Sequence, residues 1–174
     1  LKACEALQEE ISHHKQLDAL ATRVLSRITD KTAPFVKYSI IQEDVDALKA
    51  EVTAALKGAQ AGGDLTTASA AIEAVMDKHH ALMRLAARHD QLIKDCDGLE
   101  TQHQALMGSE YRYAIREDLE QLDGGISQAR EAAAKRDHDA AEAHRKTAQA
   151  RAVDATAKDK MAGNVAPEPE NIKA

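Results

Sequence analysis

Apolar residues recur at alternating intervals of three and four positions between residues 82 and 106, which is the spacing of one face of an α-helix. With Ile72 and Val75 upstream, the pattern predicts a single helix from Leu65 to Met107. At a rise of 1.5 Å per residue, that helix would be roughly 64 Å long. A helix of this length needs other long helices to cover its apolar face, so the pattern favours a bundle. The positions that carry the alternation are Leu82, Leu85, His89, Leu92, Cys96, Leu99, His103 and Leu106.

Three other segments carry the same spacing. The first spans residues 7–28 and the second residues 41–59, and Pro34 lies in the connection between them. The last begins at Ile115 and continues to about residue 160, with alanine in place of large residues after Ile126. Gly62-Gly63 and Gly108-Ser109 separate the segments, because glycine commonly ends a helix.

Composition supports long helices and argues against catalysis. Alanine supplies 35 of the 174 residues, while only one phenylalanine and three tyrosines are present. Such a chain cannot build the large aromatic core of most enzyme folds of this length. The formal net charge of −6, with both signs mixed along the chain, argues against nucleic acid as a partner. Neither a phosphate-binding glycine loop nor a nucleophile motif occurs, so we expect neither an enzyme nor a cofactor.

The turns suggest an elongated antiparallel arrangement. Folding the chain at Gly62-Gly63 pairs Val52 with Ile72, and folding it at Gly108 pairs Cys96 with Leu122. We therefore expect an all-α fold of three long rods over residues 1–162, the first rod broken near Pro34, followed by a flexible Pro/Glu tail at residues 163–174. In the preferred arrangement the first helix runs on past the break and covers residues 86–107. In the alternative it folds back beside the second helix, and the rest of the hairpin projects.

Two cysteines, Cys4 and Cys96, allow one disulfide in an oxidising compartment or two free thiols in a reducing one. A disulfide needs the two Cα atoms within about 7 Å. Only the preferred arrangement brings them near that distance, so a bridge would reject the folded-back alternative.

Histidine and glutamate occur twice as Glu-x-x-His, at Glu10–His13 and Glu100–His103. This spacing puts a carboxylate and an imidazole on one helix face, as in di-iron bundles. Such a site needs further inward glutamates at the same level, and none is evident, so we expect no metal site. We expect His89 and His103 to lie on the apolar stripe and the pairs His13-His14 and His79-His80 to face solvent.

The four aromatic residues lie in or beside connections. Phe35 and Tyr38 flank the break, and Tyr111 and Tyr113 precede the last segment. They either cap the ends of the bundle or form a contact surface at the Gly108 turn. The candidate exposed tip consists of Ser109, Glu110, Tyr111, Arg112 and Tyr113.

A family resemblance follows from the two ends of this alanine- and acid-rich chain. Residues 2–7 read Lys-Ala-Cys-Glu-Ala-Leu, and residues 167–170 read Pro-Glu-Pro-Glu. Together with the long antiparallel helices, these stretches resemble trypanosome surface proteins. The glutamic acid/alanine-rich coat protein is the most similar in character, and variant surface glycoproteins and the haptoglobin–haemoglobin receptor share the bundle style.

The resemblance implies an extracellular, non-enzymatic coat protein that shields a parasite membrane and is held there by a GPI-type lipid anchor after the tail. Its partners would be neighbouring coat proteins, with antibodies or host molecules meeting the membrane-distal tip. The Gly62-Gly63 turn would face the membrane, and the Gly108 turn would be that tip. The alternative from the residues is an intracellular coiled-coil scaffold or oligomerisation module that uses an unburied helix face.

Overall fold

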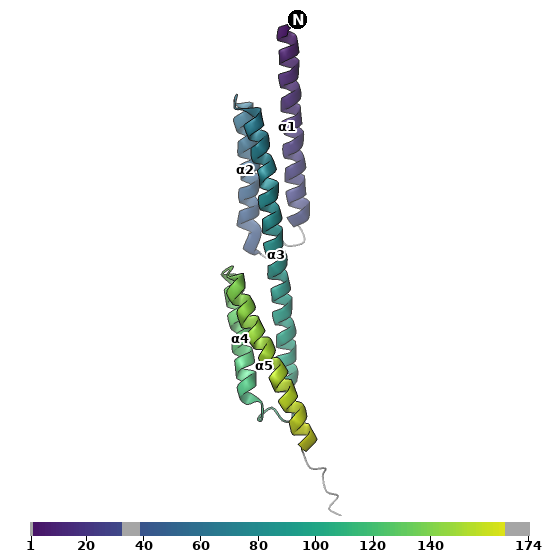
Figure 1. Cartoon of the computed structure of the whole chain (residues 1–174), viewed down its shortest axis with the longest axis vertical. Helices are drawn as coiled ribbons and strands as arrows, with labels where there is room; N and C mark the ends of the chain where they lie inside the picture. The colour runs from purple at the N-terminus through teal and green to yellow at the C-terminus, as the bar shows by residue number, and fades with distance from the viewer. Residues whose placement is uncertain (1, 33–38, 166–174) are drawn as a thin grey trace, which may run out of the picture. The chain divides into compact units, whose positions relative to one another are not determined.

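The computed structural model describes residues 2–32 and 39–165, and all of the regular structure in these residues is helical (Figure 1). The predicted all-α class is therefore confirmed. The chain divides into two units, unit 1 at residues 1–87 and unit 2 at residues 88–174. The helices are α1 at Lys2–Thr32, the short 3-10 helix η2 at Ser39–Ile41, α2 at Gln42–Gln60, α3 at Leu65–Met107, α4 at Arg116–Ala134 and α5 at His138–Val165.

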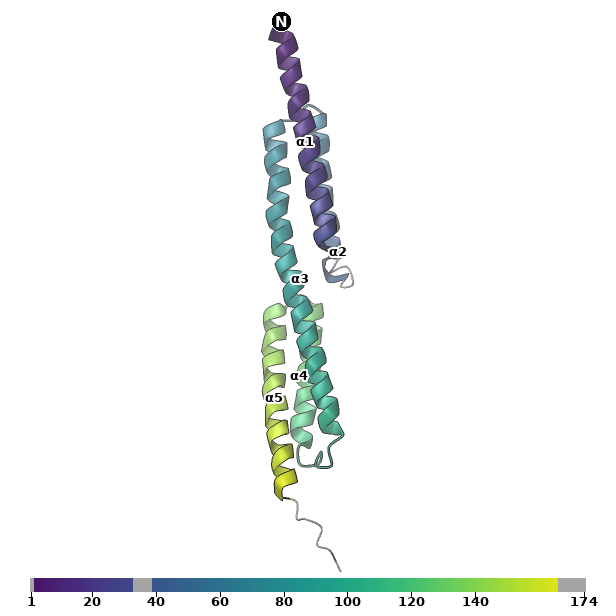
Figure 2. The ribbon, with the colours of Figure 1, turned by 90° about the vertical axis from the view of Figure 1, so that its right-hand side faces the viewer.

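Unit 1 is built by α1, α2 and the first half of α3, which lie side by side in both views (Figures 1 and 2). Each helix buries one narrow stripe of aliphatic and alanine side chains, as the three- and four-residue spacing predicts. The shared core consists of Leu17, Ala21, Val24 and Ile28 from α1, Ile41 of η2, Val45, Leu48, Val52 and Ala59 from α2, and Ala68, Ile72, Val75 and Ala86 from α3.

The turn between α2 and α3 depends on its two glycines. Gly62 has φ of +93°, which L side chains rarely adopt, and a Cβ on Gly63 would lie 2.7 Å from the carbonyl oxygen of Gly58. The Gly63 amide donates to that same oxygen at 3.0 Å. Asp64 then caps α3 by accepting from the Thr66 and Thr67 amides at 3.2 and 2.9 Å. The predicted helix boundary at this turn is confirmed.

Unit 2 packs the second half of α3 against α4 and α5, and alanines make up half of its main core cluster. Gly125 of α4 lets α5 approach closely, since a Cβ there would lie 3.0 Å from the Cβ of Ala148. The core contains Leu92, Cys96 and Leu99 from α3, Leu122, Ile126, Ala129 and Ala133 from α4, and Ala141, Ala148 and Ala152 from α5, with a smaller cluster of Leu106, Ile115, Leu119 and Ala155.

The prediction of one long helix after Ile115 is wrong. The helix passes through Gly124-Gly125 but ends at Ala134, where Arg136 takes φ of 64°. The Arg136 and Asp137 amides donate to the carbonyls of Ala133 and Ala132, both at 3.0 Å, which closes the α4 terminus. Asp137 starts α5 by accepting from the Ala140 amide at 3.0 Å. The reversal occurs without a glycine, so no ordinary helix-stop residue marks it.

The path of the first helix also differs from the preferred arrangement. α1 does not run on to cover residues 88–107, because its buried stripe belongs to the core of unit 1 with α2. α5 covers that part of α3 instead. Val75 of α3 lies in the core of unit 1. The expected neighbours Val52 and Ile72, and likewise Cys96 and Leu122, do share a core. α5 extends to Val165, while residues 166–174 of the expected tail lie outside the described residues.

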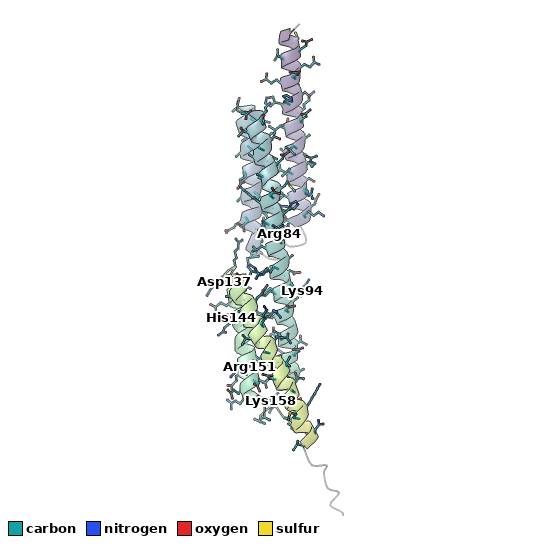
Figure 3. All side chains as sticks on the ribbon, viewed as in Figure 1. Arg84, Lys94, Asp137, His144, Arg151 and Lys158 are labelled. Carbon is teal, nitrogen blue, oxygen red and sulfur yellow. The ribbon has the colours of Figure 1, made fainter. Side chains whose placement is uncertain are left out.

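Ion pairs connect the three helices of unit 2 around its alanine core. Arg88 of α3 contacts Asp139 and Glu142 of α5 at 2.7 and 2.8 Å. Lys158 of α5 contacts Asp118 of α4, whose carboxylate is buried, at 2.6 Å. Lys158 and Arg151 lie along α5, and Asp137 marks the start of that helix (Figure 3). Exposed pairs contribute little each, but pairs between helices help to define their register.

We predict opposite effects of leucine at the two adjacent glycines of α4. Gly125→Leu forces α5 away from α4 and lowers the free energy of unfolding by about 1–3 kcal/mol. Gly124→Leu meets no atom within 4 Å of its Cβ and raises it by about 0.5–1 kcal/mol, because leucine favours a helix interior over glycine. Urea unfolding followed by circular dichroism measures both. Equal effects of the two substitutions would contradict the close approach at Ala148.

Candidate functional site

The predicted tip lies in the connection between α3 and α4, where part of it is pinned to α5. The hydroxyl of Ser109 donates to the carboxylate of Asp159 and accepts from the Tyr111 amide at 3.1 Å. Tyr111 packs against Gly163, where a Cβ would come within 3.3 Å of the ring. These two residues therefore hold the turn onto the last part of α5, while Glu110, Arg112 and Tyr113 are exposed.

Arg112 and Tyr113 form an exposed pair. The guanidinium carbon lies 5.1 Å from the centre of the Tyr113 ring, and Nη2 donates to the phenol oxygen at 3.3 Å. That hydrogen bond, helped by the positive charge, lowers the pKa of Tyr113. The pair borders a cavity of about 350 Å³, which opens between the end of α3 and the start of α4. Its lining residues are His103, Met107, Arg112, Tyr113, Arg116, Leu119, Glu120 and Asp123.

The contacts of Ser109 and Tyr111 place this turn within unit 2. Because they join residues 109–111 to Asp159 and Gly163, the turn lies at the end of unit 2 where α5 ends.

The cysteines are both free. Cys4 is exposed on α1, and Cys96 is completely buried in the core of unit 2. Burial raises the pKa of the Cys96 thiol, which keeps it protonated and unreactive at neutral pH. The possible Cys4–Cys96 disulfide is therefore not formed in this structure.

Histidines on α3 lie deeper than the pattern indicated. His89 is buried on the stripe, as expected, with its ring edge-on to His138 at 5.5 Å between centroids. His79 was expected to face solvent, yet only 1 % of it is exposed, and its Nε2 lies 3.2 Å from the hydroxyl of Thr32. Burial lowers the pKa of both His79 and His89. Burial therefore favours the neutral form of both imidazoles.

The two Glu-x-x-His pairs do not come together as metal ligands in the structure. Glu100 forms an ion pair with Arg130 of α4 at 2.6 Å, and His103 borders the cavity described above. Glu10 and His13 are exposed on α1. Within residues 2–32 and 39–165, no group of three or more histidine, cysteine, aspartate or glutamate side chains is placed to hold a metal ion.

Among the described residues of unit 1, the most exposed large apolar side chains lie at the start of α1. Leu7 is 58 % and Ile11 52 % exposed, although they continue the stripe that is buried from Leu17 onward. The first turns of α1 extend beyond the turn between α2 and α3 in both views (Figures 1 and 2). We call Leu7 and Ile11 the α1 stripe. Sequence periodicity identified these residues as core positions and could not show that no helix covers them.

A cavity of about 430 Å³ lies next to this stripe, between α1 and α3. It is followed along α1 by a second one of about 290 Å³, and Leu20, Arg23 and Glu73 line both. In the part of the chain that is described, neither Arg23 nor Arg27 forms an ion pair with an acidic residue. The first cavity is lined by His13, Gln16, Leu17, Leu20, Arg23, Leu65, Thr66, Ser69 and Glu73.

Comparisons with protein-family models, with curated protein sequences and with solved structures found no match. In the described residues, every helix is too short or too polar to span a lipid bilayer. The class that the geometry defines is therefore an all-α protein of two three-helix units.

We predict that acid destabilises the fold through its buried histidines. In the unfolded chain a histidine takes up a proton near pH 6.5, whereas His79 and His89 resist it when folded. Their stabilising contribution is complete above pH 6.5 and is lost as the pH falls through that value, at most about 1.4 kcal/mol per pH unit for each. Urea unfolding between pH 5 and 8 measures the slope.

Two variants locate the source of this slope. His79→Gln removes one titrating group and should flatten the pH dependence, whatever it does to stability at pH 8. Arg84→Gln, an exposed substitution on α3 in the same unit, should leave the slope unchanged. A wild-type stability that is constant between pH 5 and 8 would contradict the prediction.

Proposed function

We propose that this chain is a non-enzymatic helical protein that works by self-association, with the α1 stripe as its association surface. The observation that carries the proposal is the exposure of Leu7 and Ile11, at 58 % and 52 %, on a helix face that is otherwise buried. Uncovered apolar positions on a core stripe are typical of a site where another helix packs.

A second copy of the chain suits this surface in charge. Residues 5–10 of α1 carry three glutamates, whereas Arg23 and Arg27 border the neighbouring cavities. Two α1 helices that pair antiparallel about a two-fold axis near His14 bring Glu5 of one copy level with Arg23 of the other. The same pairing brings Leu7 and Ile11 over the cavity that Leu17 and Leu20 line in the partner. Both halves of such an interface are identical, as a two-fold dimer requires.

We predict a concentration-dependent dimer. Sedimentation equilibrium should show the mass rising from 18.8 kDa toward twice that value as concentration increases. The double variant Leu7→Glu, Ile11→Glu should stay monomeric, because it places charges in the apolar contact. Val153→Glu is the matched control, since Val153 is 59 % exposed on α5 in unit 2, and it should associate like the wild type. A wild-type protein that stays monomeric at all concentrations would contradict the proposal.

The second candidate is the coat protein that the resemblance implies: an extracellular protein held at the cell surface by a lipid anchor. The observation that favours it is the narrow cross-section of each unit, since three helices with interaxial distances of about 8–10 Å occupy little membrane area per copy. Neighbouring coat proteins would be its partners, and antibodies or host molecules would meet its outer face. In this proposal Ser109 and Tyr111 lie on the anchor side of unit 2.

We predict the outcome of cell labelling for this candidate. Antibodies against the folded protein should stain intact cells that produce it, and phospholipase C specific for phosphatidylinositol should release the stain. Staining that requires permeabilised cells would reject the coat role without affecting the dimer. A dimer and a surface location are compatible, so each experiment decides its own proposal.

A further inference from the structure

The cavity between the end of α3 and the start of α4 has an apolar floor. Leu119 is buried beneath it, and Met107, which is 47 % exposed, forms one side. The ring of Tyr113, 78 % exposed, stands at the side of the connection. A volume of about 350 Å³ lies within the range of small-molecule sites.

Four charged side chains line the cavity, and two of them neutralise each other. Arg116 and Glu120, one helical turn apart on α4, form an ion pair at 2.8 Å. The remaining two are Arg112 and Asp123. In residues 2–32 and 39–165, Arg112 contacts the Tyr113 ring and hydroxyl but no carboxylate, and Asp123 contacts no cation.

The two remaining charges enter the cavity lining from different segments of the chain. Arg112 belongs to the connection before α4, and Asp123 lies two helical turns into α4. Arg116 and Asp123 are seven positions apart, which corresponds to roughly 10 Å along the helix axis. Along the chain, Leu119 and the Arg116–Glu120 ion pair lie between Arg112 and Asp123. The lining therefore offers a cation, an apolar floor with a neutralised ion pair beside it, and an anion.

We propose that this cavity binds an elongated molecule with a carboxylate at one end, an apolar chain in the middle and an ammonium group at the other. The carboxylate pairs with the guanidinium of Arg112, which presents several N–H donors in a plane. The chain lies on Met107 and Leu119 beside the Tyr113 ring, and the ammonium group pairs with Asp123. This binding site is independent of the association surface on α1, because all its residues belong to unit 2.

Three probes of equal chain length test the proposal: 8-aminooctanoate, octanoate and octylamine. Each is titrated into the full-length protein, and amide chemical shifts between residues 103 and 123 report binding. Because exposed ion pairs are weak, 8-aminooctanoate should bind about three- to fivefold more tightly than either probe that lacks one charge. Octanoate or octylamine binding as tightly as 8-aminooctanoate would overturn the proposal, and so would shifts confined to other parts of the chain.

Two variants test which side chain binds which end of 8-aminooctanoate. Arg112→Gln should bring the affinity for 8-aminooctanoate down to that for octylamine, and Asp123→Asn should bring it down to that for octanoate. Both residues are exposed, so neither change should unfold the protein. Arg84→Gln and Asp77→Asn are the matched controls, because both residues are exposed in unit 1, and they should leave all three affinities unchanged. An unchanged affinity for 8-aminooctanoate in Arg112→Gln contradicts the proposed orientation.

Discussion

The apolar stripe of α3 is the constraint on which both units depend. It runs through all of Leu65–Met107, and each half of it must be covered by two other helices because a single partner leaves a narrow stripe half exposed. α1 and α2 cover the first half, and α4 and α5 cover the second. Every other feature of the fold follows from the way these four helices reach α3.

The two units meet this constraint with different side chains. Unit 1 uses large aliphatic residues, such as Ile28, Val52 and Ile72, which bury substantial area each. In unit 2, the buried residues of α5 are mainly alanine. The helices must therefore approach closely to make contact, as α4 and α5 do at Gly125 and Ala148. Small residues specify the relative position of two helices weakly. The ion pairs of Arg88 and Asp118 between helices add the register that alanine lacks.

The candidate sites were only partly predictable from the sequence. The turn at residues 109–113 could be found from two signals. Gly108 ends the helix, and the aromatic residues that follow it fall outside the apolar stripe. The anchoring of Ser109 and Tyr111 to α5 could not be found, since it depends on where α5 ends. His79 was misjudged because α1 brings Thr32 against it across unit 1. Leu7 and Ile11 fit the core pattern perfectly well, and only the lengths of α2 and α3 leave them uncovered.

The sequence alone determined the all-α class, the span of α3 and the boundary at Gly62-Gly63, because helical periodicity and glycine act locally. The tertiary structure decided which helix covers which half of α3. A stripe identifies the face that a helix buries but not its partner, so two paths for α1 fitted the same pattern. The tertiary structure also decided the reversal of the chain at Arg136. A left-handed arginine is unfavourable by itself, and α5 compensates for it by burying its alanines against α3 and α4.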